Sequence, residues 1–554
     1  MKLVECVPNF SEGRDQGILD AISAVINTVK GVTLLDVDPG ESTNRTVFTM
    51  VGSPESVLEA AFIAIKKASE LIDMSKHTGA HPRFGATDVC PFVPVSDISM
   101  EECVELARKL GKRVGEELQI PVYLYEYAAS KPKWQNLAEV RKGEYEGLAG
   151  RVGKPEWQPD FGPHTFNAKS GALAIGAREF LIAYNINLNS RDQKKAHDLA
   201  LTIREKGRVT RDQNGKLIKD KDGKKVMTEG LFSNCKAVGW YVEDFQRAQI
   251  SINLTNYKVT PPHLVLEKVR ELAVANGIQI TGSEIVGLLP KEAMLEAGKY
   301  YLNRLGECAG LPEKMILTTA VQSMGLDDLY KFQLDKKVIE YAIKEDNKLA
   351  DMTLMEFADE LSTDTPAPGG GSVAALCLSI SGALSSMVAN LTFGKKGYEA
   401  HWEAVKPIAE KGQSIKAKAM SAIDEDTEAF NEMMAAIKLS RKTDAEILVR
   451  NQAIQEATKG AIMVPLATLE LAFQAVELAA EIAAIGNSNA LSDAGVAAIT
   501  AAAAAKSAFL NVKINMAGIT DEAFKQNVMD NSEKLLSSIE KKASAIEQDI
   551  INRI

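Results

Sequence analysis

The sequence lacks several features that would set it apart from ordinary globular proteins. Its 554 residues include only six cysteines, none of them in a C-x-x-C pair. That spacing excludes a disulfide framework and a zinc knuckle, and it suits a reducing compartment. The opening MKLVECVPNF has no apolar run, so no signal peptide is visible. Acidic residues outnumber basic ones by 74 to 64, which argues against a general nucleic-acid binder. We therefore expect a cytoplasmic protein without a nucleic-acid partner.

Long hydrophobic runs are also scarce. The best candidate for a membrane span, Val373–Leu391, contains four serines and Asn390. Its small residues are more typical of a tightly packed helix in a bundle than of a lipid-facing helix. We therefore expect no membrane partner. At 45% apolar and 25% charged residues, the composition is that of a globular protein, and the length predicts more than one domain.

The chain divides into two halves with different patterns. Up to about Leu326, short β-rich runs alternate with helical stretches, which predicts an α/β fold. We expect two similar α/β subdomains at 1–178 and 179–326, then a polar, helical connector at 327–350. From 351 to 554 strand signals almost vanish, and nine alanines lie between Leu491 and Leu510. This density of small residues predicts an all-α helical bundle and favours a homo-oligomer that shares helix faces.

The expected elements follow from the hydrophobic periodicity. Strands are predicted at Leu3–Val7, Val32–Val37, Thr46–Val51, Val89–Val95, Val122–Tyr125, Phe180–Ile186, Ala248–Leu254 and Gln279–Val286. Helices are predicted at Gly17–Val29, Ser53–Ile72, Met100–Leu118 and Pro262–Asn276. The charged segment 207–230 has turn signals at Asn214-Gly215 and Asp222-Gly223. It is either an exposed hairpin insertion or a basic lid over an anionic ligand.

A histidine-containing loop precedes the predicted strand Val89–Val95. His77 and His81 are spaced like a metal-binding pair, but Gly79 and Pro82 oppose a helix there, and no glutamate follows His77. We therefore expect no metal. His81 is either a structural histidine in a glycine-rich turn or a catalytic one, since a neutral imidazole can move a proton between two amines.

Two further segments of this half carry polar groups. Asp38 lies near a turn at the end of a predicted strand, where it either caps the turn, orients His81 or holds an amine. A polar loop follows further along and could offer backbone N–H groups and a lysine to a flat anionic ligand. It comprises Pro163, His164, Thr165, Phe166, Asn167, Ala168, Lys169, Ser170, Gly171 and Ala172.

Five motifs of this half resemble the glutamate formimidoyltransferase family. They are VPNFSEGRD, DVDPGESTNRTVFT, HPRFGATDVCPFVPV, PDFGPHTFNAKSGA and FLIAYNINL, in family order. The resemblance implies transfer of a formimino group from N-formimino-L-glutamate to N5 of tetrahydrofolate, in histidine breakdown. It implies that His81 is catalytic, that Asp38 is a site aspartate and that 163–172 binds the folate. Arg45, Arg83 and Lys169 are candidate carboxylate partners.

The helical half contains a glycine loop and a cluster of acids. Gly369, Gly370, Gly371 and Ser372 open directly into a helix, as a flexible hinge or as a set of N–H donors for an anion or a ring carbonyl. The run IDEDTEAF places Asp424 and Glu428 on one helix face and Asp426 on another. Such a run is either a solvated surface or part of a site.

This half resembles the cyclodeaminase/cyclohydrolase family. APGGGSVAAL, MVANLTFGKK, IDEDTEAF, SDAGVAA and NVKIN occur in family order. The resemblance implies a bundle that dimerises, with Asp424 as the catalytic aspartate and Asp426 as its competitor. It also implies ring closure of 5-formimino-tetrahydrofolate to 5,10-methenyl-tetrahydrofolate with loss of ammonia. The candidate folate contacts, besides the glycine loop, are Lys395, Lys396, Asn487 and Asp493; the two lysines could equally be solvated.

Together the two resemblances imply a bifunctional formimidoyltransferase–cyclodeaminase with polyglutamylated tetrahydrofolate as co-substrate. Three alternatives stay open at this point. The helical half could be a methenyl-tetrahydrofolate cyclohydrolase, or a non-catalytic module for folate binding or oligomerisation. The first half could instead hydrolyse formiminoglutamate without tetrahydrofolate.

Overall fold

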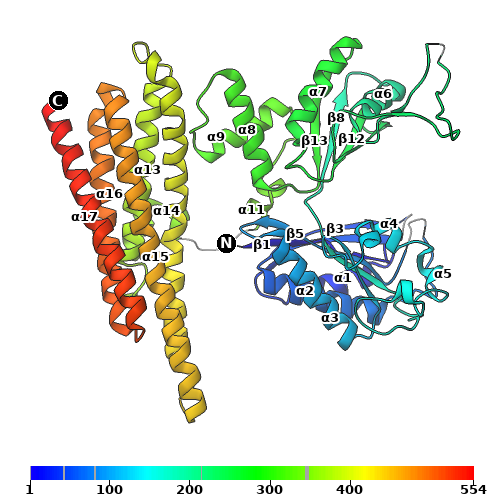
Figure 1. The fold of residues 1–554 in the computed structure, drawn as a ribbon, viewed down its shortest axis with the longest axis horizontal. Coiled ribbons are helices and arrows are strands. Elements are labelled where there is room, and N and C mark those ends of the chain that lie inside the picture. The colour runs from blue at the N-terminus through cyan, green and yellow to red at the C-terminus, as the bar shows by residue number, and fades with distance from the viewer. Residues whose placement is uncertain (1, 42–43, 80–82, 214, 344–348) are drawn as a thin grey trace. The chain divides into compact units, whose positions relative to one another are not determined.

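The computed structural model describes residues 2–41, 44–79, 83–213, 215–343 and 349–554. The chain forms two compact units, which we treat separately (Figure 1). Unit 1 comprises Met1–Met294 and Met324–Lys344, and unit 2 comprises Leu295–Ser323 and Glu345–Ile554. The predicted fold class, an α/β half followed by an all-α half, is confirmed. The domain boundaries at residues 178, 326 and 350 stay predictions.

The first sheet of unit 1 has seven strands. Its order is β1-β4-β2-β5-β7-β6, with β3 paired to β4, and only β5, β7 and β6 run parallel. The strands are β1 (Leu3–Cys6), β2 (Asn9–Phe10), β3 (Val32–Gly40), β4 (Arg45–Gly52), β5 (Thr87–Ser96), β6 (Val122–Glu126) and β7 (Leu173–Ala177).

Helices α1 (Gln16–Ile26), α2 (Pro54–Leu71) and α3 (Met100–Glu117) cover one face of this sheet. Proline at the first position of α2 and a Ser99–Glu102 capping box at α3 satisfy or remove unpaired N–H groups at the helix starts. Two short helices, α4 (Leu137–Val140) and α5 (Glu144–Leu148), build a smaller core on the opposite face. That second face carries the candidate site described below.

The second sheet of unit 1 is antiparallel, in the order β11-β12-β8-β13. Its strands are β8 (Ile182–Leu188), β11 (Cys235–Val242), β12 (Arg247–Leu254) and β13 (Ile280–Val286). Helix α6 (Gln193–Ile203) packs on β11 and β12, and α7 (Pro262–Ala275) contacts α6. The predicted helical connector is only partly helical, because α10 (Leu334–Lys337) and α11 (Ile339–Ala342) are single turns.

The charged insertion forms an exposed pair of hairpin turns. Strands β9 (Arg208–Val209) and β10 (Met227–Thr228) close its base. The carboxylates of Asp212 and Asp220 each accept a backbone N–H four residues later, so these acids are engaged in turns. The hairpin interpretation is therefore confirmed, while a role as a lid stays a prediction.

Unit 2 is a bundle of long helices. It contains most of α8 (Lys291–Leu305) and α9 (Glu313–Met324), followed by α12 (Leu354–Leu361), α13 (Gly370–Thr392), α14 (Trp402–Ile437), α15 (Asp444–Ile485), α16 (Leu491–Asn515) and α17 (Glu522–Arg553). Seven alanines of α16 are buried in the core, which lets neighbouring helices approach closely.

Three segments of unit 2 are long and apolar enough to cross a membrane by length and composition alone: Gly370–Thr392, Asp444–Ile485 and Ser488–Gly518. Much of each apolar window is buried in the bundle, at 61%, 56% and 44%. A large part of their hydropathy therefore serves helix packing.

Candidate functional site

The candidate site of unit 1 lies on the sheet face opposite α1–α3. Asp38, Val47, Asn9 and Val89 pair directly across β3, β4, β2 and β5. Residues paired in this way point to the same face of a sheet. Val89 belongs to the core beneath α4 and α5, so this row lies on that face. Asp38 is exposed there and Asn9 is buried.

Asn44 holds the start of the histidine loop. Its backbone is left-handed, with φ 50°, and its side chain accepts from the Gly13 N–H at 3.0 Å and donates to Thr78 O at 2.9 Å. The Asn44 carbonyl lies 2.9 Å from Nε2 of His77. Burial lowers the pKa of His77, which favours a neutral imidazole. His81 lies outside the described residues, so its catalytic role stays a prediction.

The structure brings the polar loop 163–172 against the chain that follows His81. Ala86 N–H donates to Ser170 O at 2.9 Å, and Ala172 N–H donates to Phe84 O at 3.1 Å. Gly171 has φ +68°, and a Cβ there would lie 2.5 Å from Phe84 O, so only glycine permits this approach. Two segments that lie about 80 residues apart in sequence therefore form one surface.

Two of the predicted basic residues have protein partners. Arg83 forms an ion pair with Glu146, and its buried Nε has no partner among the described residues. Lys169 Nζ donates to the Glu70 carbonyl at 2.8 Å. Each contact ties one of the two loops to a neighbouring helix, so both side chains already have a partner within the protein.

A third cation, Arg45, belongs to a buried cluster on the same face. It donates to Asn9 Oδ1 at 2.8 Å and to Asp88 Oδ2 at 2.6 Å. Asp88 Oδ2 also accepts from Arg141, at the end of α4. Burial lowers the pKa of Arg45, although the neighbouring Asp88 opposes this shift.

The candidate site of unit 2 lies where α13 begins. Gly371 packs directly against the carboxylate of Asp426 on α14. Ser372 Oγ donates to Ile423 O at 3.0 Å and lies 3.3 Å from Asp426 Oδ2. Burial raises the pKa of Asp426, while hydrogen bonds from Ser372 act in the opposite direction. Asp426 is thus a partly desolvated carboxyl held over the glycine loop.

Asp424 has different surroundings. Its Oδ1 accepts the Leu349 N–H at 2.7 Å, at the start of a short 3-10 turn. Asn511 of α16 lies beside Gly370, close to the same helix start as Asp426. The structure therefore places Asp426, rather than Asp424, at the glycine loop.

The remaining predicted folate contacts lie at the other end of α13. Lys395 Nζ donates to Asn487 Oδ1 at 2.7 Å, and Asp493 lies in the first turn of α16 nearby in the chain. Lys396 is exposed. Thr392 lies twenty residues after Ser372 in this helix, a rise of about 30 Å. Within one chain the two groups therefore do not form one pocket.

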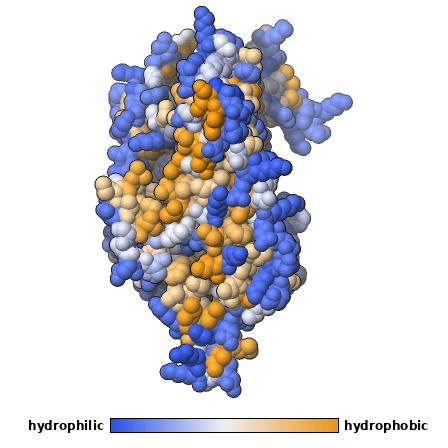
Figure 2. Space-filling model, turned by 90° about the vertical axis from the view of Figure 1, so that its left-hand side faces the viewer, coloured by the Kyte–Doolittle hydropathy of each residue, from blue (hydrophilic) through white to orange (hydrophobic). Residues whose placement is uncertain are grey.

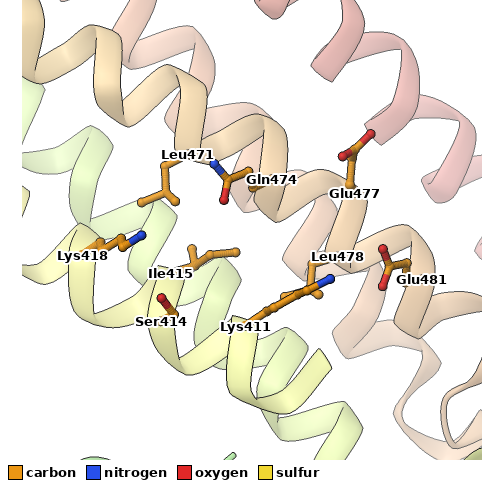
Figure 3. Close-up of a pocket in the computed structure, with 9 residues that line it drawn as sticks. All are labelled: Lys411, Ser414, Ile415, Lys418, Leu471, Gln474, Glu477, Leu478 and Glu481. Carbon is orange, nitrogen blue, oxygen red and sulfur yellow. The ribbon is translucent and has the colours of Figure 1, made fainter. Parts of the chain in front are cut away.

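A separate pocket of about 210 Å³ lies between α14 and α15 (Figure 3). Its lining residues are Lys411, Ser414, Ile415, Lys418, Leu471, Gln474, Glu477, Leu478 and Glu481. Glu477 is paired with Lys542 of α17. None of the sequence-predicted site residues lines this pocket, so we do not assign it to the site at the start of α13.

Comparisons with known proteins cover both units. Residues 3–178 match the formiminotransferase domain, N-terminal subdomain, residues 183–344 match the formiminotransferase domain, and residues 353–534 match formiminotransferase-cyclodeaminase. The formimidoyltransferase-cyclodeaminase of Mus musculus is 42% identical and covers 98% of this chain and 98% of its own length. The chain belongs to the formimidoyltransferase-cyclodeaminase family.

Single-function proteins match parts of this family member. The glutamate formimidoyltransferase of Streptococcus pyogenes serotype M1 is 42% identical over 54% of this chain and 93% of its own. The methenyltetrahydrofolate cyclohydrolase of Methylorubrum extorquens is 40% identical over 33% of this chain and 89% of its own. The resemblance stated from the sequence motifs is confirmed.

Sequence reasoning assigned no role to several residues of the two sites. Asn9 and Asp88 lie in two different motifs and Arg141 lies in none, so no local pattern predicts that strand pairing and helix α4 bring the three together. Asn44 was quoted within a motif without a role, and its turn conformation is visible only in the backbone. Asp88 carried a signal, since a charged residue inside an apolar strand must find a partner when buried.

Proposed function

We propose that the chain transfers the formimino group of N-formimino-L-glutamate to N5 of tetrahydrofolate and then closes the product to 5,10-methenyl-tetrahydrofolate with release of ammonia. The observation that carries this proposal is the match to a formimidoyltransferase-cyclodeaminase over 98% of the chain. The first activity has further support from the glutamate formimidoyltransferase of Streptococcus pyogenes serotype M1, which matches 54% of the chain.

The first step takes place on unit 1. As N5 attacks the amidine carbon, a C–N bond forms and N5 must lose a proton. As the glutamate nitrogen leaves, it must gain one. His81 carries that proton from one nitrogen to the other. Asp38 lies on the face beside the loop and orients the imidazole or holds the amine, while the loop 163–172 binds the folate.

The second step takes place at the start of α13. N10 attacks the amidine carbon and loses a proton, and the departing nitrogen gains one and leaves as ammonia. A carboxyl whose pKa is raised by burial can accept and return this proton. We assign the step to Asp426, because it faces the glycine loop, with Asp424 as the alternative.

The direct test follows glutamate, ammonia and methenyl-tetrahydrofolate together in one incubation with formiminoglutamate and tetrahydrofolate. All three should appear at rates that depend on the enzyme. Glutamate without tetrahydrofolate would indicate a hydrolase. Glutamate without enzyme-dependent ammonia would refute the second activity.

The second candidate for unit 2 is a methenyl-tetrahydrofolate cyclohydrolase, which the match to the Methylorubrum extorquens protein favours. It would hydrolyse methenyl-tetrahydrofolate and release no ammonia from 5-formimino-tetrahydrofolate. A non-catalytic module would leave ring closure at the rate measured without enzyme. Ammonia release from 5-formimino-tetrahydrofolate identifies a cyclodeaminase, and hydrolysis of methenyl-tetrahydrofolate then separates a cyclohydrolase from a non-catalytic module.

Unit 2 is also the proposed site of homo-oligomerisation. Apolar side chains are exposed on α13 and α16, among them Leu510 at 65% and Ile514 at 72%. Figure 2 shows an apolar band along one side of the molecule, between hydrophilic margins. An interface between copies would bury such side chains. Sedimentation analysis should give a multiple of the 60.0 kDa chain mass, and Ile514→Glu should lower it; a native mass of one chain would refute this.

The cellular setting belongs to the same proposal. The reaction fits histidine degradation and one-carbon metabolism in the cytoplasm, with polyglutamylated tetrahydrofolate as co-substrate and no metal. A tethered folate could pass between sites if the oligomer brings them close. Equal release of the intermediate by the fused chain and by separately expressed halves would refute such channelling.

A further inference from the structure

The cluster formed by Asp88, Arg45 and Arg141 is unusual in its charge. Asp88 is 1% exposed, and the side chains of Arg45 and Arg141 are 12% and 15% exposed. Two guanidinium groups share one carboxylate oxygen, so the three side chains together carry a net charge of +1. Buried charges are normally paired, because an unpaired one loses its hydration without compensation.

Two polar atoms of the cluster also lack hydrogen bonds. Among the described residues, neither Oδ1 of Asp88 nor Nε of Arg141 has a partner, although both atoms are buried. A buried polar atom that has lost its water without gaining another hydrogen-bond partner is destabilising. Arg141 thus lacks a hydrogen-bond acceptor, and Asp88 lacks a donor. A ligand with a carboxylate and N–H groups would supply both, and its negative charge would match the net positive charge of the cluster.

The position of the cluster connects it with the loops of the formimino-transfer site. Arg45 follows Asn44, which holds the histidine loop. Arg141 begins a segment whose next turn contacts both loops, because Tyr145 N–H donates to Arg83 O at 2.8 Å and its hydroxyl donates to Ala168 O at 2.6 Å. The cluster therefore lies beside the surface where formiminoglutamate is expected.

We propose that Arg141 binds a carboxylate of the formimino-amino-acid substrate, and that Asp88 holds Arg141 and Arg45 in place through Oδ2 while its Oδ1 accepts an N–H of the substrate. This inference rests on the proposed function. Formiminoglutamate supplies what the cluster lacks, namely an anionic acceptor for Arg141 and amidine N–H donors for Asp88. The cluster then selects an N-formimino dicarboxylic amino acid over a formimino donor without carboxylates.

The test compares two donors, formiminoglutamate and formamidine, which lacks a carboxylate. The measured quantity is the ratio of their kcat/KM values for formimino transfer to tetrahydrofolate. Arg141→Gln should lower kcat/KM for formiminoglutamate by about 10²-fold, the effect of one charge-assisted hydrogen bond, and leave that for formamidine within about two-fold. Asp88→Asn should raise KM for formiminoglutamate with little change in kcat.

Arg151 offers a matched control in the same layer. It is buried, its Nε also lacks a partner among the described residues, and its guanidinium stacks on Trp157 at 4.3 Å. It does not contact Asp88, so Arg151→Gln should change thermal stability without changing the donor ratio. A merely structural role of Arg141 predicts the same behaviour for both variants.

The outcomes separate this inference from the function on which it rests. A native chain that transfers from neither donor would refute the proposed function. A native chain that prefers formiminoglutamate, with an Arg141→Gln variant that keeps the full preference, would refute only the role of Arg141. If Arg141→Gln does not fold, Arg141→Lys, which keeps the charge but not the forked donor, should reduce the donor ratio in part; an unchanged ratio would overturn the proposal.

Discussion

Gly371→Ala tests the assignment of ring closure to the start of α13. Gly371 has no left-handed backbone, and alanine favours a helix by up to about 1 kcal/mol, so the substitution should not unfold α13. Its Cβ, however, would lie 2.5 Å from Asp426 Oδ2 and closer still to Oδ1. Ordinary van der Waals contact begins at 3.4 Å, so the Asp426 carboxylate must move by about 1 Å.

A displacement of this size has a predictable kinetic effect. Misplacing a reacting group by about 1 Å can cost roughly 10²-fold in rate, which corresponds to about 2.7 kcal/mol in the activation barrier. We expect kcat for ring closure of 5-formimino-tetrahydrofolate to fall by about this factor. Formimino transfer should be unchanged, because its proposed residues lie in unit 1. One purified variant thus provides both the measurement and its internal control.

Gly369→Ala is the matched substitution in the same loop. The nearest heavy atom to its added Cβ would be Pro366 O at 3.7 Å, which is an ordinary contact. It should keep ring closure within about two-fold of the native rate. The reasoning is refuted if folded Gly371→Ala closes the ring at the native rate, or if both substitutions reduce the rate equally.

Four further predictions concern carboxyl groups and the histidine loop. Asp426→Asn should slow ring closure, measured as ammonia release, by about 10²–10⁴-fold, and Asp424→Asn should slow it much less. The reverse order would show that Asp424 is the catalytic carboxyl. Burial raises the pKa of Asp426, so the ionised carboxylate destabilises the folded state at neutral pH. Asp426→Asn should therefore not lower the melting temperature at neutral pH. Burial likewise raises the pKa of Glu5 to about 7, so its contribution to stability is complete below pH 4.5 and is lost as the pH rises through 7. The difference in unfolding free energy between Glu5→Gln and the native chain, measured by denaturant titration, should therefore rise by about 3 kcal/mol in favour of Glu5→Gln from pH 4.5 to pH 8. A difference that does not change with pH would contradict the raised pKa. Asn44→Gly keeps the left-handed backbone but loses two hydrogen bonds, so formimino transfer should slow while ring closure does not; a native transfer rate would show that Asn44 does not hold the loop before His81.

Most elements of unit 1 could be predicted, because their hydrophobic periods are local. The missed strands show where the local signal fails. β7 has only five residues, three of them alanine or glycine, and it is stabilised by parallel neighbours on both sides, which come from distant parts of the chain. In β11 the buried positions are Cys235, Ala237 and Gly239, whereas Val238 and Trp240 are exposed, so the usual pattern is inverted. The connector carried helical signals, but such short segments are marginal without tertiary packing.

The helical half shows the same division between local and distant information. Its class could be predicted because alanine-rich, strand-poor sequence has few other compact solutions. Asp424 and Asp426, by contrast, lie two residues apart on one helix and so point about 200° apart. This angle can be predicted from the helical period, but the side of α14 that contacts the start of α13 cannot. The register of packing placed Asp426 at Gly371 and left Asp424 to the Leu349 N–H.

By itself the sequence determined the family, the order of the two halves and the segments that carry the chemistry, because motifs and hydrophobic periods are properties of neighbouring residues. Only the tertiary structure decided which of those segments meet. The pairing of β2, β4 and β5 brought Asn9, Arg45 and Asp88 together, and α4 added Arg141. Strand pairing and helix packing join residues tens to hundreds of positions apart through register and burial, and those contacts are set by the free energy of the whole fold rather than by any local pattern.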